Sequence, residues 1–283
     1  MKGLWRIGAI TTGGLVGLAA IAAALFFGLS QSVIEKRYDR QARVTQVTIT
    51  PDLVAQGQHL SLTRGCSGCH GKDLRGRLSW EDKAIGRQFA ANLTLRAKTY
   101  SDADFDRAIR GGVDRHGKAL WDMPAPMYAN LTDEGTAAVI AYIRSLPAGG
   151  EDHPPNRFGL GWRWEMVRDA EPHSSARLVD ERKVPVDLGT EFAAGRYIAM
   201  TTCSECHGGM LEGHMTGEGL APDLVVAAVY SDAEFLQLMR TGTPTGGRKL
   251  GLMAQVAQGR FSHFSDEEIA QLHAYLSARA EKQ

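Results

Sequence analysis

The sequence is poor in cysteine and has no excess of either charge. Its 283 residues include four cysteines, all in two Cys-x-x-Cys pairs, so none is left for a structural disulfide. The 32 basic residues balance 32 acidic ones, which leaves no global positive field to favour nucleic acid. Hydrophobic content of 43% and charged content of 23% are typical of globular proteins, so extended disorder is not expected.

One long uncharged run stands at the N-terminus. Residues 7–34 lie between Arg6 and Glu35 without a charge, which is enough for a helix to cross a bilayer and contact membrane lipid. No small-residue cleavage site follows Phe26 and Phe27, so we expect an uncleaved single-pass anchor rather than a signal peptide. Basic residues flank both ends, so the positive-inside rule does not select an orientation.

The rest of the chain contains an internal repeat. The segment Cys66-Ser67-Gly68-Cys69-His70-Gly71 recurs as Cys203-Ser204-Glu205-Cys206-His207-Gly208. Further matches link residues 100–105 to 230–235 and Met123 to Met253, in the same order along the chain. The sequence therefore predicts one domain present twice.

Each copy has the pattern of short helices joined by loops. Pro51 suits a first helical position, and three Ser-x-x-acid segments resemble capping boxes, at Ser101, Ser231 and Ser265. No stretch shows convincing strand alternation, so we expect an all-α fold. The predicted organisation is a membrane anchor (1–44), a first domain (45–150), a linker (151–186) and a second domain (187–283).

The predicted linker has two unlike parts. Residues 147–155 are rich in proline and glycine, which marks a break between the copies. Residues 157–167 mix aromatic and basic side chains. Such a stretch fits a membrane surface or a partner, or a linker packed across both domains.

Cys-x-x-Cys-His is the attachment signature of c-type haem. Two cysteines three apart lie on one side of a helical turn, where each thiol adds to one haem vinyl group, and the next histidine points at the iron. Zinc or a redox dithiol are the alternatives, but histidine directly after the second cysteine, twice, is not usual zinc spacing. A redox dithiol would need a strand–helix context. We therefore expect two covalently attached haem c groups, held by Cys66, Cys69, Cys203 and Cys206, with His70 and His207 as axial iron ligands.

Each repeat resembles a class I cytochrome c domain, over about residues 50–147 and 187–280. The motif near the domain start, a methionine in mid-domain and an aromatic residue in the last helix follow the family order. The resemblance implies a transmembrane helix followed by two tandem helical domains, each folded around a haem. Gly57 and Gly195 look like the family's glycine where the first and last helices cross, meeting Tyr142 and Tyr275.

The resemblance also implies methionine as the sixth iron ligand, which raises the reduction potential. Met123 and Met253 occupy matched positions before the last helix, whereas Met127 has no counterpart. The rival ligands His116 and His214 have no counterpart either, so we expect both on the surface.

The resemblance suggests two further roles. The proximal histidine ring usually donates to a carbonyl, and Ala91 and Pro222 stand where the family places that acceptor. Arg110 and Arg240 suit either haem propionates or solvent.

The resemblance implies an electron carrier rather than an enzyme, with haem domains in the periplasm on a bacterial inner membrane. Its redox partners in a respiratory chain would be a dehydrogenase, an oxidase or a soluble cytochrome. The chain is similar to cytochrome subunits of periplasmic dehydrogenases, where three haem domains are common, and of terminal oxidases. The alternatives are a di-haem peroxidase, which needs a displaceable iron ligand, and a haem-based sensor.

Overall fold

The computed structural model describes residues 2–169, 174–216, 219–248 and 250–282, and it is mostly helical, as predicted. The first half forms α1 (Lys2–Ile34), α2 (Pro51–Thr63), α3 (Cys66–His70), β1 (Arg77–Asp82), β2 (Gly86–Ala90), α4 (Leu93–Arg96), α5 (Asp102–Gly111), α6 (Ala125–Tyr128) and α7 (Asp133–Ser145). The second half forms β3 (Arg157–Phe158), α8 (Leu160–Arg168), α9 (Ser175–Glu181), η1 (Thr190–Phe192), α10 (Ala193–Ile198), η2 (Ala199–Cys203), α11 (Ser204–His207), β4 (His214–Thr216), β5 (Gly219–Ala221), η3 (Leu224–Val229), α12 (Asp232–Thr241), α13 (Leu252–Gly259), η4 (Phe261–His263) and α14 (Asp266–Ala280).

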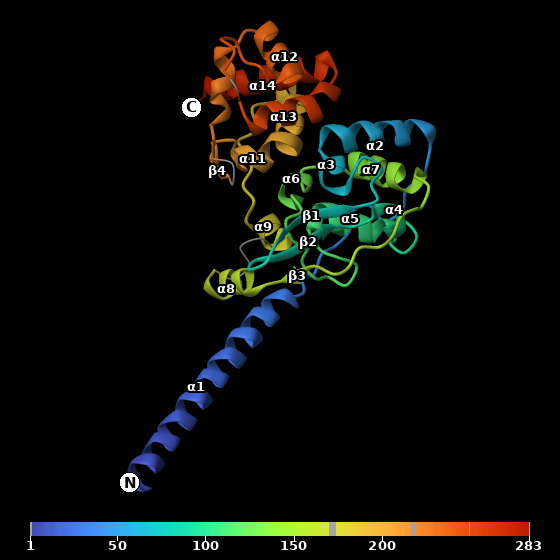
Figure 1. The fold of residues 1–283 in the computed structure, drawn as a ribbon. Coiled ribbons are helices and arrows are strands. Elements are labelled where there is room, and N and C mark those ends of the chain that lie inside the picture. Colours follow the sequence, from blue (N-terminus) through green and yellow to red (C-terminus); the bar gives the residue numbers. More distant parts are fainter. Residues whose placement is uncertain (1, 170–173, 217–218, 249, 283) are drawn as a thin grey trace.

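Helix α1 extends away from the rest of the molecule (Figure 1). Within the described residues it is the one helix long and apolar enough to cross a membrane, over Gly13–Ile34, and nearly all of that stretch is exposed. The predicted span begins at residue 7, and the side chains before residue 13 lie outside the described part. Length and composition therefore allow the predicted membrane crossing.

The predicted helix starts are confirmed. Ser101, Ser231 and Ser265 each accept a hydrogen bond from the backbone three residues on, and the acid there bonds back to the cap. Thr50 caps α2, with proline at the first helical position. Because each box satisfies orphan N–H groups at a helix start, the local sequence fixes where α5, α12 and α14 begin.

The described residues also form two small antiparallel sheets that the sequence did not predict, β1-β2-β3 and β4-β5. Only Trp80 is partly covered in β1, so that strand has no alternating pattern to recognise. Strand β3 pairs with β2 through Gly86 and Phe158, which are far apart in sequence. Such pairing depends on tertiary packing and leaves no local signal.

Each repeat has its own hydrophobic core, built where the first and last helices cross. The first core includes Leu60, Phe105 and Ile140, and the second includes Phe235, Leu272 and Tyr275. In the first copy α2 crosses α7 at Gly57, and in the second α10 crosses α14 at Gly195. These crossings confirm the predicted roles of both glycines.

We expect Gly195→Ala to destabilise the second domain by about 1–3 kcal/mol, as overpacking does. The added Cβ would lie 2.7 Å from Tyr275 Cβ and overlap the Gln271 carbonyl, so α10 would have to move away from α14. Chemical denaturation of the variant measures the loss. Gly259→Ala is the control, because a Cβ there meets no atom within 4 Å in a helix. Equal stability of the two variants would contradict the crossing.

The described parts of the segment between the repeats, residues 151–169 and 174–186, pack mainly on the first domain and α1. Trp162 of α8 stacks edge-on against Trp121 and Phe158, with ring centroids 5.8 and 4.8 Å apart. Val33 and Ile34 at the end of α1 pack against this aromatic cluster. The first domain thus adjoins α1, and the second domain lies on the side of the first domain that faces away from α1 (Figure 1).

Candidate haem-attachment sites

Both Cys-x-x-Cys-His motifs form short helices followed by the same turn. Gly71 and Gly208 end α3 and α11 with φ of 81° and 82°. Leu74 and Leu211, three residues on, also have left-handed backbones, with φ of 55° and 62°. Leucine rarely adopts this conformation, so two matched cases mark a turn held by its surroundings. Both side chains are buried in their cores, at 1% and 0% exposed.

This turn folds back over the motif histidine. The Gly76 N–H donates to the His70 carbonyl at 2.7 Å, and the Gly213 N–H donates to the His207 carbonyl at 2.8 Å. A Cβ on Gly76 would lie 2.8 Å from Asn92 N, and one on Gly213 would lie 2.7 Å from Asp223 N. Only glycine therefore lets the next segment approach the histidine ring.

That segment supplies the acceptor for each ring. His70 Nδ1 lies 2.8 Å from the Ala91 carbonyl, and His207 Nδ1 lies 2.8 Å from the Pro222 carbonyl, which confirms the predicted acceptors. Because a carbonyl only accepts, Nδ1 carries the proton and Nε2 keeps its lone pair. Burial lowers the pKa of both His70 and His207. Neutral rings with Nε2 free to bind are what an iron ligand requires.

The four cysteines form no disulfide; Cys203 is buried, Cys66 and Cys206 are half-buried, and Cys69 is exposed. Burial raises the pKa of Cys66, Cys69 and Cys206, and it raises that of Cys203 to about 12. A reactive redox dithiol has a thiol with a lowered pKa, and none of these four cysteines has one. In the described part of the chain, no three His, Cys, Asp or Glu side chains come close enough to hold a metal ion. The donor set therefore fits thioether attachment better than zinc.

The candidate sixth ligands occupy matched places. Met123 lies partly buried at the edge of the first core, just before α6, and Met253 lies at the edge of the second core, in α13. Met127, by contrast, is 2% exposed within the first core. His116 and His214 are exposed. Ligation by Met123 and Met253 stays a prediction that agrees with these positions.

Arg110 and Arg240 each form an ion pair with an aspartate at the start of the last helix of their domain. Arg110 is buried and pairs with Asp106 and, at 2.5 Å, with Asp133 at the start of α7. Arg240 pairs with Asp266 at the start of α14, at 2.6 Å. The matched aspartates were the signal that sequence reasoning missed.

The two motifs face each other across the domain interface. Arg260 of the second domain pairs with Glu205, which stands between Cys203 and Cys206, at 2.7 Å. Its guanidinium also covers Gly65 and Gly68 of the first motif, with Nη2 2.7 Å from where a Gly65 Cβ would stand. Arg260 thus contacts both attachment loops, the second through an ion pair and the first through packing.

A second arginine joins the domains next to that ion pair. Arg64 and Thr201 each stand two residues before the first cysteine of their motifs, and Arg64 Nε donates to Thr201 Oγ1 at 3.1 Å. The guanidinium lies 5.5 Å from the Tyr197 ring and 5.3 Å from the Phe264 ring. Burial lowers the pKa of Arg64. Equivalent positions meet here, which gives the interface an approximate two-fold character.

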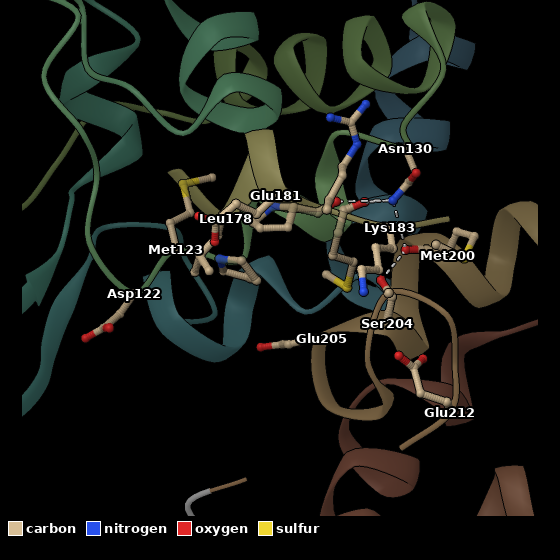
Figure 2. A pocket seen from close by; sticks show the side chains of 15 residues that line it. Asp122, Met123, Asn130, Leu178, Glu181, Lys183, Met200, Ser204, Glu205 and Glu212 are labelled. Atoms are coloured by element: carbon tan, nitrogen blue, oxygen red, sulfur yellow. Dashed lines mark hydrogen bonds between the residues drawn. The ribbon is translucent and has the colours of Figure 1, made fainter. Parts of the chain in front are cut away.

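A cleft of about 460 Å³ opens beside this interface. Figure 2 shows Met123 of the first domain at the left and Asn130 of the same domain beside Met200 of the second, with Ser204 and Glu205 below them. The cleft therefore brings the predicted iron ligand of the first copy and the attachment loop of the second to one space.

Comparisons with known proteins agree with this duplication. Residues 54–147 match the family model described as cytochrome c, and residues 190–276 match the model of cytochrome c oxidase, cbb3-type, subunit III. The chain is 24% identical to the fructose dehydrogenase cytochrome subunit of Gluconobacter japonicus, over 79% of this chain and 52% of that protein.

Two further relatives come from different assemblies. The cytochrome c subunit of the quinone alcohol dehydrogenase of Gluconobacter oxydans is 23% identical, over 80% of this chain and 54% of the relative. The cbb3-type cytochrome c oxidase subunit CcoP of Helicobacter pylori is 34% identical, over 35% of this chain and 30% of the relative. The chain spans about half the length of the dehydrogenase relatives it matches.

Proposed function

The chain contains two cytochrome c domains behind an apolar N-terminal helix, and from this we propose that it is a membrane-anchored di-haem electron-transfer subunit of a periplasm-facing oxidoreductase complex. The observation that carries the proposal is the repeated turn that sets each motif histidine with Nδ1 on a carbonyl and Nε2 free. Haem iron supplies one-electron chemistry when bound.

Cysteine, histidine and methionine side chains would each hold the haem through a different bond. Cys66 and Cys69, and likewise Cys203 and Cys206, would form the thioether bonds, because the two cysteines of each pair stand three residues apart at one helical turn. His70 and His207 would bind the iron from one side, and Met123 and Met253 from the other. A thioether ligand favours the reduced iron and leaves no open site for peroxide.

The facing motifs support transfer between the two sites within one chain. The first domain adjoins α1, so it would stand nearer the membrane, and the second would face a partner farther out (Figure 1). Electrons would pass through the two attachment loops, both of which contact Arg260. The partner would be a dehydrogenase or an oxidase, as the relatives' names suggest.

We expect Arg260→Gln to lower the reduction potentials of both haems. A cation between the two attachment loops disfavours the more positive, oxidised form of each centre, so its loss stabilises that form. Glu205→Gln should shift both potentials upward for the opposite reason. Spectroscopic redox titration measures both variants, and the double variant should lie between them. A change at only one haem would contradict the shared position of this ion pair.

An optical redox titration of the full-length protein tests the proposed function. We expect two low-spin centres at positive potentials that bind neither carbon monoxide nor peroxide. A high-spin centre that binds either ligand, or turnover of peroxide, would instead favour the peroxidase or the sensor.

A further inference from the structure

Helix α8 carries exposed apolar side chains where a domain linker would be polar. Leu160, Trp164 and Val167 are 63%, 58% and 36% exposed. Their spacing of four and three residues places them in one stripe along the helix. The opposite face is also apolar, because Trp162 and Met166 are each 1% exposed. The helix is therefore apolar on two sides, and only one of them is covered.

The covered face fixes α8 to the end of α1 (Figure 1). Arg163 donates from Nη1 to Ser30 Oγ at 2.8 Å and from Nη2 to Gln31 Oε1 at 3.0 Å. Its guanidinium lies 5.6 Å from the Phe27 ring. These contacts hold α8 at the level where α1 ends and the first domain begins.

We propose that the Leu160–Trp164–Val167 stripe lies in the lipid headgroup region of the membrane that α1 crosses. The inference rests on the proposed anchor role of α1. A bilayer is the occupant that the position favours, because Arg163 holds α8 against Ser30, Gln31 and Phe27 near the end of the span, where Phe27 and Leu29 are 47% and 55% exposed.

The side chains of α8 also suit that depth. Tryptophan is enriched at membrane–water interfaces, and Trp164 is the largest member of the stripe. Arg168 is exposed at the C-terminal end of α8, where its cation can reach anionic headgroups. With α1 and α8 both in contact with lipid, the first haem site would be held at a fixed height above the membrane rather than swinging on a single helix.

The test compares thiol labelling in the full-length, haem-loaded protein reconstituted in phosphatidylcholine–phosphatidylglycerol vesicles. Single cysteines replace Leu18 in the span, Trp164 in the stripe, and Val229, which is 76% exposed in the second domain. All three positions are exposed in the structure, so the substitutions should not disturb folding. The probe is a charged, water-soluble maleimide, and Val229→Cys corrects for the fraction of chains accessible from outside.

We expect Trp164→Cys to react with the maleimide at least several-fold more slowly than Val229→Cys. The ratio of the two reaction rates should not change when the amount of lipid per protein is increased. Reaction of Trp164→Cys as fast as Val229→Cys overturns the inference. Protection that fades on dilution assigns the stripe to a second copy, and protection that needs added partner subunits assigns it to a protein; both overturn it. Fast reaction of Leu18→Cys would instead refute the anchor of the proposed function.

Discussion

Replacing Cys203 and Cys206 with alanine is expected to leave a chain that carries one covalent haem instead of two. Cys203 stands directly before α11, and Cys206 lies within α11 next to His207, whose ring is held by the Pro222 carbonyl. Without them nothing covalent would retain a haem in the second domain. The Cys66→Ala, Cys69→Ala variant should lose the other haem, and the four-alanine variant should lose both.

Intact-protein mass and haem absorbance per chain measure the loss directly. The second domain should also unfold at lower denaturant, because a ligand that binds only the folded state stabilises it. His214→Ala is the control, since His214 is the exposed rival ligand of the same domain and should keep both haems. Retention of two haem masses by the double-alanine variant, or zinc in place of haem, would contradict the assignment of the motif.

The sequence was sufficient to predict the parts of the site that depend on local pattern. Capping at Ser101 and Ser265 follows from the local sequence, whereas the crossing glycines and the carbonyl acceptors for His70 and His207 were implied by the resemblance to cytochrome c; all of them lie within one repeat. Because the chain contains two copies, each of these positions has a counterpart in the other copy. The approximate position of each core helix followed from the same comparison.

What the sequence did not predict depends on contacts between segments far apart. Arg260 lies over the first motif and binds Glu205 of the second, which requires the domain interface to be known. The pairing of β3 with β2 and the packing of α8 on α1 likewise join segments with no shared pattern. The entry to the motif also differs, since α10 runs into α11 through the π-helical turn η2, whereas Gly65 breaks the first copy with φ of 80°.

Met123→Ala is expected to convert the first haem from low-spin to high-spin and to let it bind carbon monoxide. The thioether would no longer fill the sixth position, and the potential of that haem should fall by roughly a few tenths of a volt, within the range of about 0.8 V that axial ligands span. Met253→Ala should do the same at the second haem alone. Each variant should leave the spectrum of the other centre unchanged.

Met127→Ala is the matched control, because Met127 lies four residues away in the same segment but points into the core at 2% exposure. It should cost about 2–5 kcal/mol of stability, as buried truncations do, while both haems stay low-spin. Met123→Ala would then change the haem spectrum, whereas Met127→Ala would change only the stability of the domain. If Met123→Ala keeps a low-spin haem that ignores carbon monoxide, another side chain binds the iron, and the carrier would need a different sixth ligand.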